Sequence, residues 1–246
     1  MSYFFYYQDD LPTDVGFGYF GPEHIIWLVI IIAISSAFAA VLHNSDKNRS
    51  KRYSQILGWT IAVIYVIREL FIACTGHMSI YELPFHLCII TGYLCLAHAL
   101  TGNRIIGHFL YAGGLPGTVF ALLTPDWTVY PAFSFISITN FLYHGLIVTY
   151  VIGQLASGRF EISLKKTWQV FLLVCAIAAP VYVFDSIFKV NYMFLMIPSP
   201  GSVLCFISDI FGDKLYLLGF AIFNMLVLLL MDGIYTVIHK IRQTVK

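Results

Sequence analysis

The sequence predicts an all-α membrane protein: a single integral membrane domain, residues 1–246, built as a bundle of seven transmembrane helices. Of the 246 residues, 59% are hydrophobic and only 11% are charged. An ordinary soluble domain of this length is far less apolar. Apolar segments of about 20 residues, the length that crosses a bilayer as a helix, follow one another along the chain. This composition excludes a soluble globular enzyme and leaves no stretch for a separate soluble domain.

The helices are predicted from the apolar segments between polar connections. They cover His24–Leu42, Gln55–Cys74, Pro84–Leu100, Arg104–Leu123, Tyr130–Ile152, Trp168–Phe188 and Lys214–His239. The segment before the first helix contains three aspartates but no Lys or Arg, so it lacks the basic region of a cleaved signal peptide. It is rich in Tyr and Phe instead, which is typical of a membrane interface.

The connections alternate in charge, and this alternation predicts the orientation. Eleven of the fourteen basic residues fall in every second connection and after the last helix: Lys47, Arg49, Lys51, Arg52, Arg104, Arg159, Lys165, Lys166, Lys240, Arg242 and Lys246. The other side carries Asp9, Asp10, Asp14, Glu23, Glu82, Asp126, Asp209 and Asp213. Because basic loops stay in the cytoplasm, the N-terminus is predicted outside and the C-terminus inside.

Two segments depart from simple helices. The fourth helix contains Gly113-Gly114-Leu115-Pro116-Gly117, which should break or bend it. The segment Asn191–Gly212 is too apolar for a free loop, yet Pro198, Pro200 and Gly201 prevent a continuous helix. We expect it to form a re-entrant or capping element on the outer side, before the last helix.

The five cysteines match neither a zinc spacing nor a disulfide framework. Only Cys74 and Cys205, both predicted at the outer side, are candidates for a pair. We find no phosphate loop and no nucleic-acid patch, and we predict no metal and no cofactor. The expected partners are the lipid bilayer and a lipid substrate, while protein partners are not indicated.

Cys88 is predicted near the start of the third helix, where Pro84 suits the first position. The positive end of the helix dipole favours a thiolate there. The alternative is that Cys88 packs as a small apolar side chain. His86 is two residues away, about 200° around a helix, so a base for Cys88 should come from another helix.

The fifth helix offers that base. Ser137, Asn140 and His144 recur at spacings of three and four, and they form a polar stripe on an apolar helix. Lipid disfavours such a stripe, so we expect it to face the bundle interior. The alternative is that Ser and Asn join helices by hydrogen bonds and that His144 is a core histidine.

Arg68 and Glu69 lie in the outer part of the second helix and point about 100° apart, so they need not bond each other. One interpretation is a buried ion network that holds the bundle. The other is that Arg68 binds an anionic group such as a phosphate. His98, His108, Asn224 and Asp232 are interpreted as structural.

Several motifs resemble one family. Glu82-Leu83-Pro84-Phe85-His86-Leu87-Cys88 resembles the Leu-Pro-x-His-Leu-Cys signature of the bacterial YwaF-type integral membrane proteins and their animal relatives. The segments 121–126, 143–145, 191–195 and 200–202 are similar to further motifs of that family, in the same order. The resemblance covers nearly the whole chain.

The resemblance implies an activity and a location. Animal members are described as phospholipid acyltransferases that use a membrane cysteine and a histidine. Carried onto this sequence, Cys88 is the nucleophile and His144 its base, in the plasma membrane of a bacterium. Some relatives have an acidic residue just after the cysteine, whereas this chain has Ile89 and Ile90.

We therefore expect a lipid acyl-transfer enzyme, an acyltransferase or acyl hydrolase. Asn140 or His86 would orient the base or stabilise the oxyanion. The predicted substrate-binding residues are Arg68, Glu69, Asn191 and Tyr192. On the expected boundaries, His144 lies about 10 Å deeper than Cys88, so a later start or a strong tilt of the fifth helix is required. The alternatives are a transporter with a polar intramembrane path and a non-catalytic membrane scaffold.

Overall fold

The computed structural model describes residues 3–199 and 202–244, and at 242 and 243 it describes the backbone alone. Throughout this part of the chain the secondary structure is helical. Pro200, Gly201 and Lys246, which entered the predictions above, lie outside the described residues, as does the side chain of Arg242.

Eight α-helices and one π-helical turn form the body of the described chain. They are α1 (Pro22–His43), α2 (Lys47–Cys74), α3 (Leu87–Thr101), α4 (Arg104–Phe109), the π-helical turn η3 (Leu110–Gly114), α5 (Leu115–Leu123), α6 (Phe135–Ala156), α7 (Thr167–Phe188) and α8 (Val203–Thr244). The short 3-10 turns are η1 (Gln8–Asp10), η2 (Ile80–Glu82), η4 (Leu164–Lys166) and η5 (Tyr192–Phe194).

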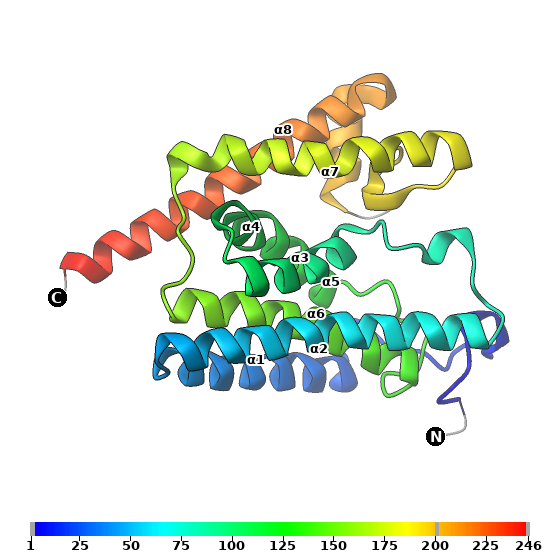
Figure 1. Ribbon diagram of the computed structural model, residues 1–246. Coiled ribbons are helices and arrows are strands. Elements are labelled where there is room, and N and C mark those ends of the chain that lie inside the picture. Colours follow the sequence, from blue (N-terminus) through cyan, green and yellow to red (C-terminus); the bar gives the residue numbers. More distant parts are fainter. Residues whose placement is uncertain (1–2, 200–201, 245–246) are drawn as a thin grey trace.

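Six helical segments are long and apolar enough to cross a membrane: α1, α2, the run α4–η3–α5, α6, α7 with its preceding turn, and α8. The seventh expected span, α3, has only 15 residues, or about 22 Å against a hydrocarbon core of roughly 30 Å. It nevertheless lies among the others and runs along the same axis (Figure 1). The prediction of seven full spans is therefore confirmed for six.

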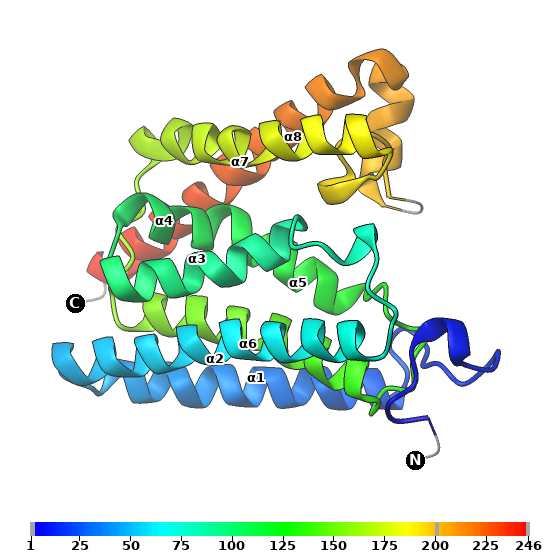
Figure 2. The ribbon, with the colours of Figure 1, turned by 45° about the vertical axis from the view of Figure 1, so that its right-hand side comes forward.

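The helices form three layers. α1, α2 and α6 lie together on one side, α3, α4 and α5 lie in the middle, and α7 and α8 cover the other side (Figures 1 and 2). In the first layer, the rings of Trp27 and Phe141 stack at 5.0 Å, and the hydroxyls of Ser35 and Thr149 lie 2.9 Å apart. Such close contacts make this layer the most tightly packed part of the bundle.

The expected break in the fourth span is a π-helical turn. The backbone stays helical through Gly114 and Leu115, and the Leu115 N–H reaches back five residues to the carbonyl oxygen of Leu110. Proline has no N–H to donate and its ring clashes with the carbonyl four residues earlier. A wider turn placed just before Pro116 relieves that conflict, so α4 and α5 continue as one span.

Two helices begin where their caps are, and not where their apolar segments begin. The carboxylate of Asp46 accepts from the N–H groups of Asn48 and Arg49, so α2 begins at Lys47, eight residues before the expected start. Ser134 caps α6 in the same way, so α6 begins at Phe135, five residues later than expected. The later start moves His144 about 7 Å closer to the beginning of its helix.

The basic connections meet at one end of the bundle. His43 Nδ1 lies 3.1 Å from the Ala156 carbonyl oxygen. Arg159 donates to the Lys47 carbonyl oxygen at 2.6 Å, and Arg104 pairs with Glu161 at 3.0 Å. The charge alternation in the sequence therefore corresponds to two physically separate ends.

The segment predicted to cap or re-enter the outer side consists of η5 and the first turns of α8. Its backbone reverses at Gly212, where φ is 68° and ψ is 166°, a conformation that glycine adopts without a steric penalty. Figure 1 shows the result as the short orange arm before the long final helix. Cys205 in this arm and Cys74 in α2 are both free thiols, so the candidate pair is not formed.

Candidate functional site

A cavity of about 1530 Å³ is lined by residues from all three layers, among them Arg68 of α2, Cys88 of α3 and Phe171 of α7. Small-molecule pockets are typically about 300–1,000 Å³, so this one suits a larger ligand. One wall carries the polar side chains of α3, α6 and the loop after α5. The opposite wall is mostly apolar and includes Phe171, Val174, Ala178, Phe220, Phe223 and Val227.

Cys88 stands at the second residue of α3 and lines the cavity. The expectation that Pro84 starts this helix is wrong, because His86 is the N-cap and Leu87 the first helical residue. The first N–H groups of a helix have no acceptor within it. The N–H groups of Leu87 and Cys88 are therefore available beside the thiol, and the side chain of Thr118 lies within hydrogen-bonding reach of that thiol.

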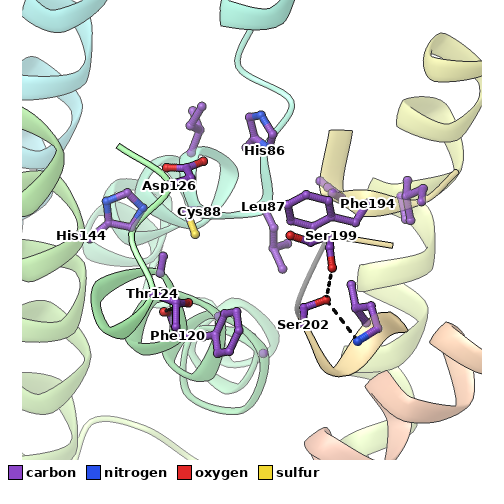
Figure 3. A pocket seen from close by; sticks show the side chains of 18 of the residues that line it. His86, Leu87, Cys88, Phe120, Thr124, Asp126, His144, Phe194, Ser199 and Ser202 are labelled. Carbon is purple, nitrogen blue, oxygen red and sulfur yellow. Dashed lines mark hydrogen bonds between the residues drawn. The ribbon is translucent and has the colours of Figure 1, made fainter. Parts of the chain in front are cut away.

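His144 is held in one tautomer. Its Nδ1 lies 2.8 Å from the Asn140 carbonyl oxygen, and because a carbonyl only accepts, Nδ1 carries the proton in neutral imidazole. Nε2 is then the proton acceptor. The ring stacks on Trp127 with 5.1 Å between centroids and 25° between planes. Figure 3 shows His144 and Cys88 facing the same part of the cavity.

The polar stripe on α6 divides between two roles. Asn140 and His144 line the cavity, whereas Ser137 is fully buried in the first turn of the helix and does not reach it. Asn140 orients His144 through its backbone carbonyl, and its side chain remains on the cavity wall. His86 also lines the cavity, and its ring meets Tyr192 edge to face at 4.8 Å.

Arg68 and Glu69 bond each other, although their adjacency on the helix does not require it. Arg68 Nη1 lies 2.5 Å from Glu69 Oε1, and Nη2 lies 3.2 Å from Glu82 Oε2. Tyr7 donates to the other oxygen of Glu82 at 2.7 Å. The long arginine side chain lets the guanidinium group reach both carboxylates. The angle of about 100° between the Cα–Cβ bonds of Arg68 and Glu69 therefore does not keep the two groups apart. The buried ion network is thus observed, whereas phosphate binding by Arg68 stays a prediction.

Only Arg68 of this pair lines the cavity; Glu69 does not. Burial and the hydrogen bond to Glu82 raise the pKa of Tyr7 well above its ordinary value, so the phenol stays protonated and keeps donating.

Asn191 and Tyr192 lie outside the cavity lining. The Asn191 amide donates to the Ile197 carbonyl oxygen at 2.8 Å and accepts from two N–H groups of the same loop. The Tyr192 hydroxyl donates to the Ile80 carbonyl oxygen and accepts from the Leu83 N–H at 3.1 Å. Burial raises the pKa of Tyr192 to about 12, so it remains a donor. The Asn191 side chain holds its own loop together, and the Tyr192 side chain joins that loop to the segment 80–83.

Sequence reasoning missed three features of the site and its surroundings. Asp126 and Trp127 occupy the cavity wall beside His144. The sequence places Asp126 on the acidic side and at the end of the family motif 121–126, and it gives no signal for Trp127, which directly follows that motif. Asp232 pairs with His108 at 2.7 Å and accepts a hydrogen bond from Thr167. Both partners are far from Asp232 in the sequence, so no local sequence pattern predicts these contacts.

His, Cys, Asp and Glu side chains nowhere gather in threes as a metal site in the described residues. No curated protein and no solved structure matches the chain. The sequence matches the TMEM164 family over residues 19–232, which is most of its length. That match gives this family and not the bacterial YwaF-type name that the motifs suggest. With its six apolar spanning helices, the chain is a multi-pass integral membrane protein and belongs to the TMEM164 family.

Proposed function

We propose that this protein transfers or hydrolyses the acyl group of a phospholipid-like substrate, with Cys88 as nucleophile and His144 as base. The observation that carries the proposal is the shared cavity: a thiol at a helix N-terminus and an imidazole of fixed tautomer line one wall of a space with an apolar opposite wall. An acyl chain suits the apolar wall, and an ester suits the polar one.

In the first step His144 Nε2 takes the proton of the Cys88 thiol. The thiolate attacks the carbonyl carbon of the ester, a C–S bond forms, and the carbonyl oxygen becomes an oxyanion. The N–H groups of Leu87 and Cys88 are the nearest preorganised donors, with the Asn140 side chain as a further candidate. The C–O bond then breaks, and the leaving alkoxide takes the proton from His144.

In the second step the thioester on Cys88 is resolved. Water or a lipid hydroxyl gives its proton to His144 Nε2 and attacks the thioester carbon. The C–S bond breaks and the thiolate recovers the proton from His144. Water as the acceptor makes the protein a hydrolase, and a lipid hydroxyl makes it a transferase. Arg68, on the cavity wall, is the proposed contact for a lipid phosphate.

We also place the protein in the bacterial plasma membrane, with its N-terminus outside. The orientation rests on the positive-inside rule, since the basic connections meet at one end of the bundle, and the bacterial membrane rests on the motif resemblance alone. Cys88 follows the N-cap of α3, so it lies towards the opposite end. The proposed chemistry therefore takes place in the outer half of the bilayer.

The test is acyl release or transfer from a mixed phospholipid pool by the purified protein. Cys88→Ser and His144→Ala should each reduce turnover by at least about 100-fold, the typical contribution of such groups. Cys175→Ser is the matched control, because Cys175 lines the same cavity from α7 and takes no part in the mechanism. Its turnover should equal that of the unchanged protein.

The proposal fails if the purified protein shows no turnover on this pool, or if turnover survives Cys88→Ser. Loss of turnover in Cys175→Ser to the same degree would also contradict it, because a general disturbance of the cavity would then explain the result. Retained transport of lipid by Cys88→Ser in vesicles would instead support the transporter alternative.

A further inference from the structure

The cavity is too shallow below Cys88 to hold a whole lipid chain. The Cys88 thiol lies within hydrogen-bonding reach of Thr118 in α5. Five residues further inward along the same span, a Cβ at Gly113 would lie 3.6 Å from the side chain of Leu228, which is fully buried in the cluster that closes this end. Five helical residues rise about 8 Å, whereas a lipid chain crosses half of a hydrocarbon core of roughly 30 Å. A chain whose ester reaches Cys88 therefore has to leave the cavity sideways.

One side of the cavity is closed towards the bilayer by contacts between α7 and the segment before α3. The ring of Phe85 lies 4.8 Å from that of Phe184 in α7 and meets Tyr192 edge to face at 5.4 Å. The Tyr192 hydroxyl donates to the Ile80 carbonyl oxygen and accepts from the Leu83 N–H. These contacts join α7 and η5 to the segment 80–85, so they leave no path for a chain on this side.

The other side lies between α5 and α8, and there the two helices separate. Their spans run antiparallel and meet at Gly113 and Leu228. Seven residues further out in the same register, Phe120 of α5 is opposite Ala221 of α8, and both line the cavity. Figures 1 and 2 show α8 moving away from the middle layer towards its outer part. The cavity therefore extends between α5 and α8 above their contact.

The rim of this gap is apolar and adjoins the lipid-facing surface. Phe120 is 53% exposed and Leu217, one turn out from Ala221, is 39% exposed, and both line the cavity. On the same turns of α8, Leu218 and Ile222 are 54% and 44% exposed and lie outside the cavity lining. Because α8 is one of the apolar spanning helices, these neighbouring side chains face hydrocarbon. The gap therefore connects the cavity with the bilayer interior.

We propose that the gap between α5 and α8 is a lateral portal through which one acyl chain of a bilayer lipid enters the cavity and brings its ester to Cys88. The inference rests on the proposed function for the chemistry at Cys88, whereas entry of the chain does not need that chemistry. Entry from the side keeps the chain in an apolar environment throughout. A separate opening lies at the outer end, where Tyr81 lines the cavity and is 65% exposed.

The experiment compares two forms of substrate for the purified full-length protein. The protein is embedded in vesicles of diether phospholipids, which carry no ester. Equal parts of phosphatidylcholine and phosphatidylethanolamine are then supplied either as long-chain esters mixed into the bilayer or as short-chain esters dispersed in water. Ala221→Trp places a large ring in the gap. Ile222→Trp is the matched control, because Ile222 is the next residue and lies outside the cavity lining.

Ala221→Trp should lower the rate on the long-chain esters about tenfold or more, because a chain that cannot enter does not position its ester at Cys88. The rate on the short-chain esters, which reach the cavity through its outer opening, should stay within a few-fold of that of the unchanged protein. Ile222→Trp should match the unchanged protein on both forms. If Ala221→Trp does not fold, Leu217→Trp carries the same expectation, because this rim position is already exposed.

Equal losses on both forms would overturn the portal, because they would indicate a disturbed site. An unchanged rate on the long-chain esters would overturn it as well.

A second measurement does not depend on turnover. A long-chain lipid with a photoreactive diazirine in its acyl chain is irradiated in the same vesicles, and its attachment to Leu87, which lines the cavity beside Cys88, is measured by mass spectrometry. Attachment that is lost in Ala221→Trp and kept in Ile222→Trp supports the portal. If the unchanged protein shows this attachment without turnover, only the proposed function fails. No attachment in the unchanged protein, or equal attachment in all three proteins, overturns the portal.

Discussion

Two glycines near the site should respond in opposite ways to replacement by alanine. Gly92 lies where α3 contacts α6, and Gly117 lies in α5. A Cβ at Gly92 in α3 would lie 2.0 Å from the Tyr143 hydroxyl oxygen and 2.6 Å from its ring carbon. A Cβ at Gly117 in α5 meets only the end of Leu87, at 3.9 Å. Gly92→Ala should therefore force Tyr143 to move, whereas Gly117→Ala should be accommodated.

Tyr143 has little freedom to give way. It is 5% exposed, its hydroxyl donates to the Ile89 carbonyl oxygen at 3.0 Å, and its ring packs against Tyr65 at 5.6 Å. Overpacking costs about 1–3 kcal/mol and the lost hydrogen bond about 1 kcal/mol, while alanine recovers about 1 kcal/mol of helix propensity. The net loss of stability is about 2 kcal/mol for Gly92→Ala.

The assay is thermal unfolding in detergent, followed by tryptophan fluorescence. For a chain of this length, a loss of about 2 kcal/mol lowers Tm by roughly 4–8 °C. Gly117→Ala should leave Tm unchanged or raise it slightly. Equal Tm values for the two variants would refute the steric reasoning, because helix propensity alone would then account for both.

Two further predictions concern the buried pair of His108 and Asp232 and the orientation of the bundle. His108→Leu and Asp232→Leu should each destabilise the protein by about 3 kcal/mol, because each leaves the other group of a buried pair without its partner. The double variant should lose less than the sum in the same unfolding assay, and additive losses would contradict the pairing. For orientation, in a background with Cys74→Ser and Cys205→Ser, Thr13→Cys should react with a membrane-impermeant maleimide in intact cells. Leu164→Cys should react only after permeabilisation, and the reverse pattern would refute the proposed sidedness.

The sequence predicts the membrane-spanning part of each helix well because the stretch that lies in lipid must be apolar. Apolar length does not mark where a helix begins, however. The starts of α2 and α6 depend on Asp46 and Ser134, whose side chains occupy the first free N–H groups. Pro84 suggests a helix start by residue preference, yet Pro84 and Phe85 form a turn and the helix begins only after His86. Caps of this kind depend on local hydrogen bonds that composition does not reveal.

The same limit applies to the site. Cys88 and His144 were predicted as a pair although the expected boundaries separated them in depth, and the later start of α6 brings His144 closer to the beginning of its helix. Asp126 was missed because nothing in its neighbourhood distinguishes a cavity carboxylate from one on the outer surface. The partners of Asp232 lie 65 and 124 residues away, so only the folded chain brings them together.

Polar residues inside the bundle can be sorted by one physical criterion, namely whether the protein itself satisfies their hydrogen-bonding groups. His24 is fully buried, with one ring nitrogen bonded to the Phe20 N–H and the other to the Leu122 carbonyl oxygen. Both ring nitrogens of His24 are therefore occupied, and neither is left to bind a substrate. His144 uses only Nδ1 in this way and presents Nε2 to the cavity. In lipid, a group without a partner is costly, so an unused acceptor on a cavity wall indicates a function that occupies it. By that criterion His144, and not His24, is the histidine for which we propose a role in catalysis.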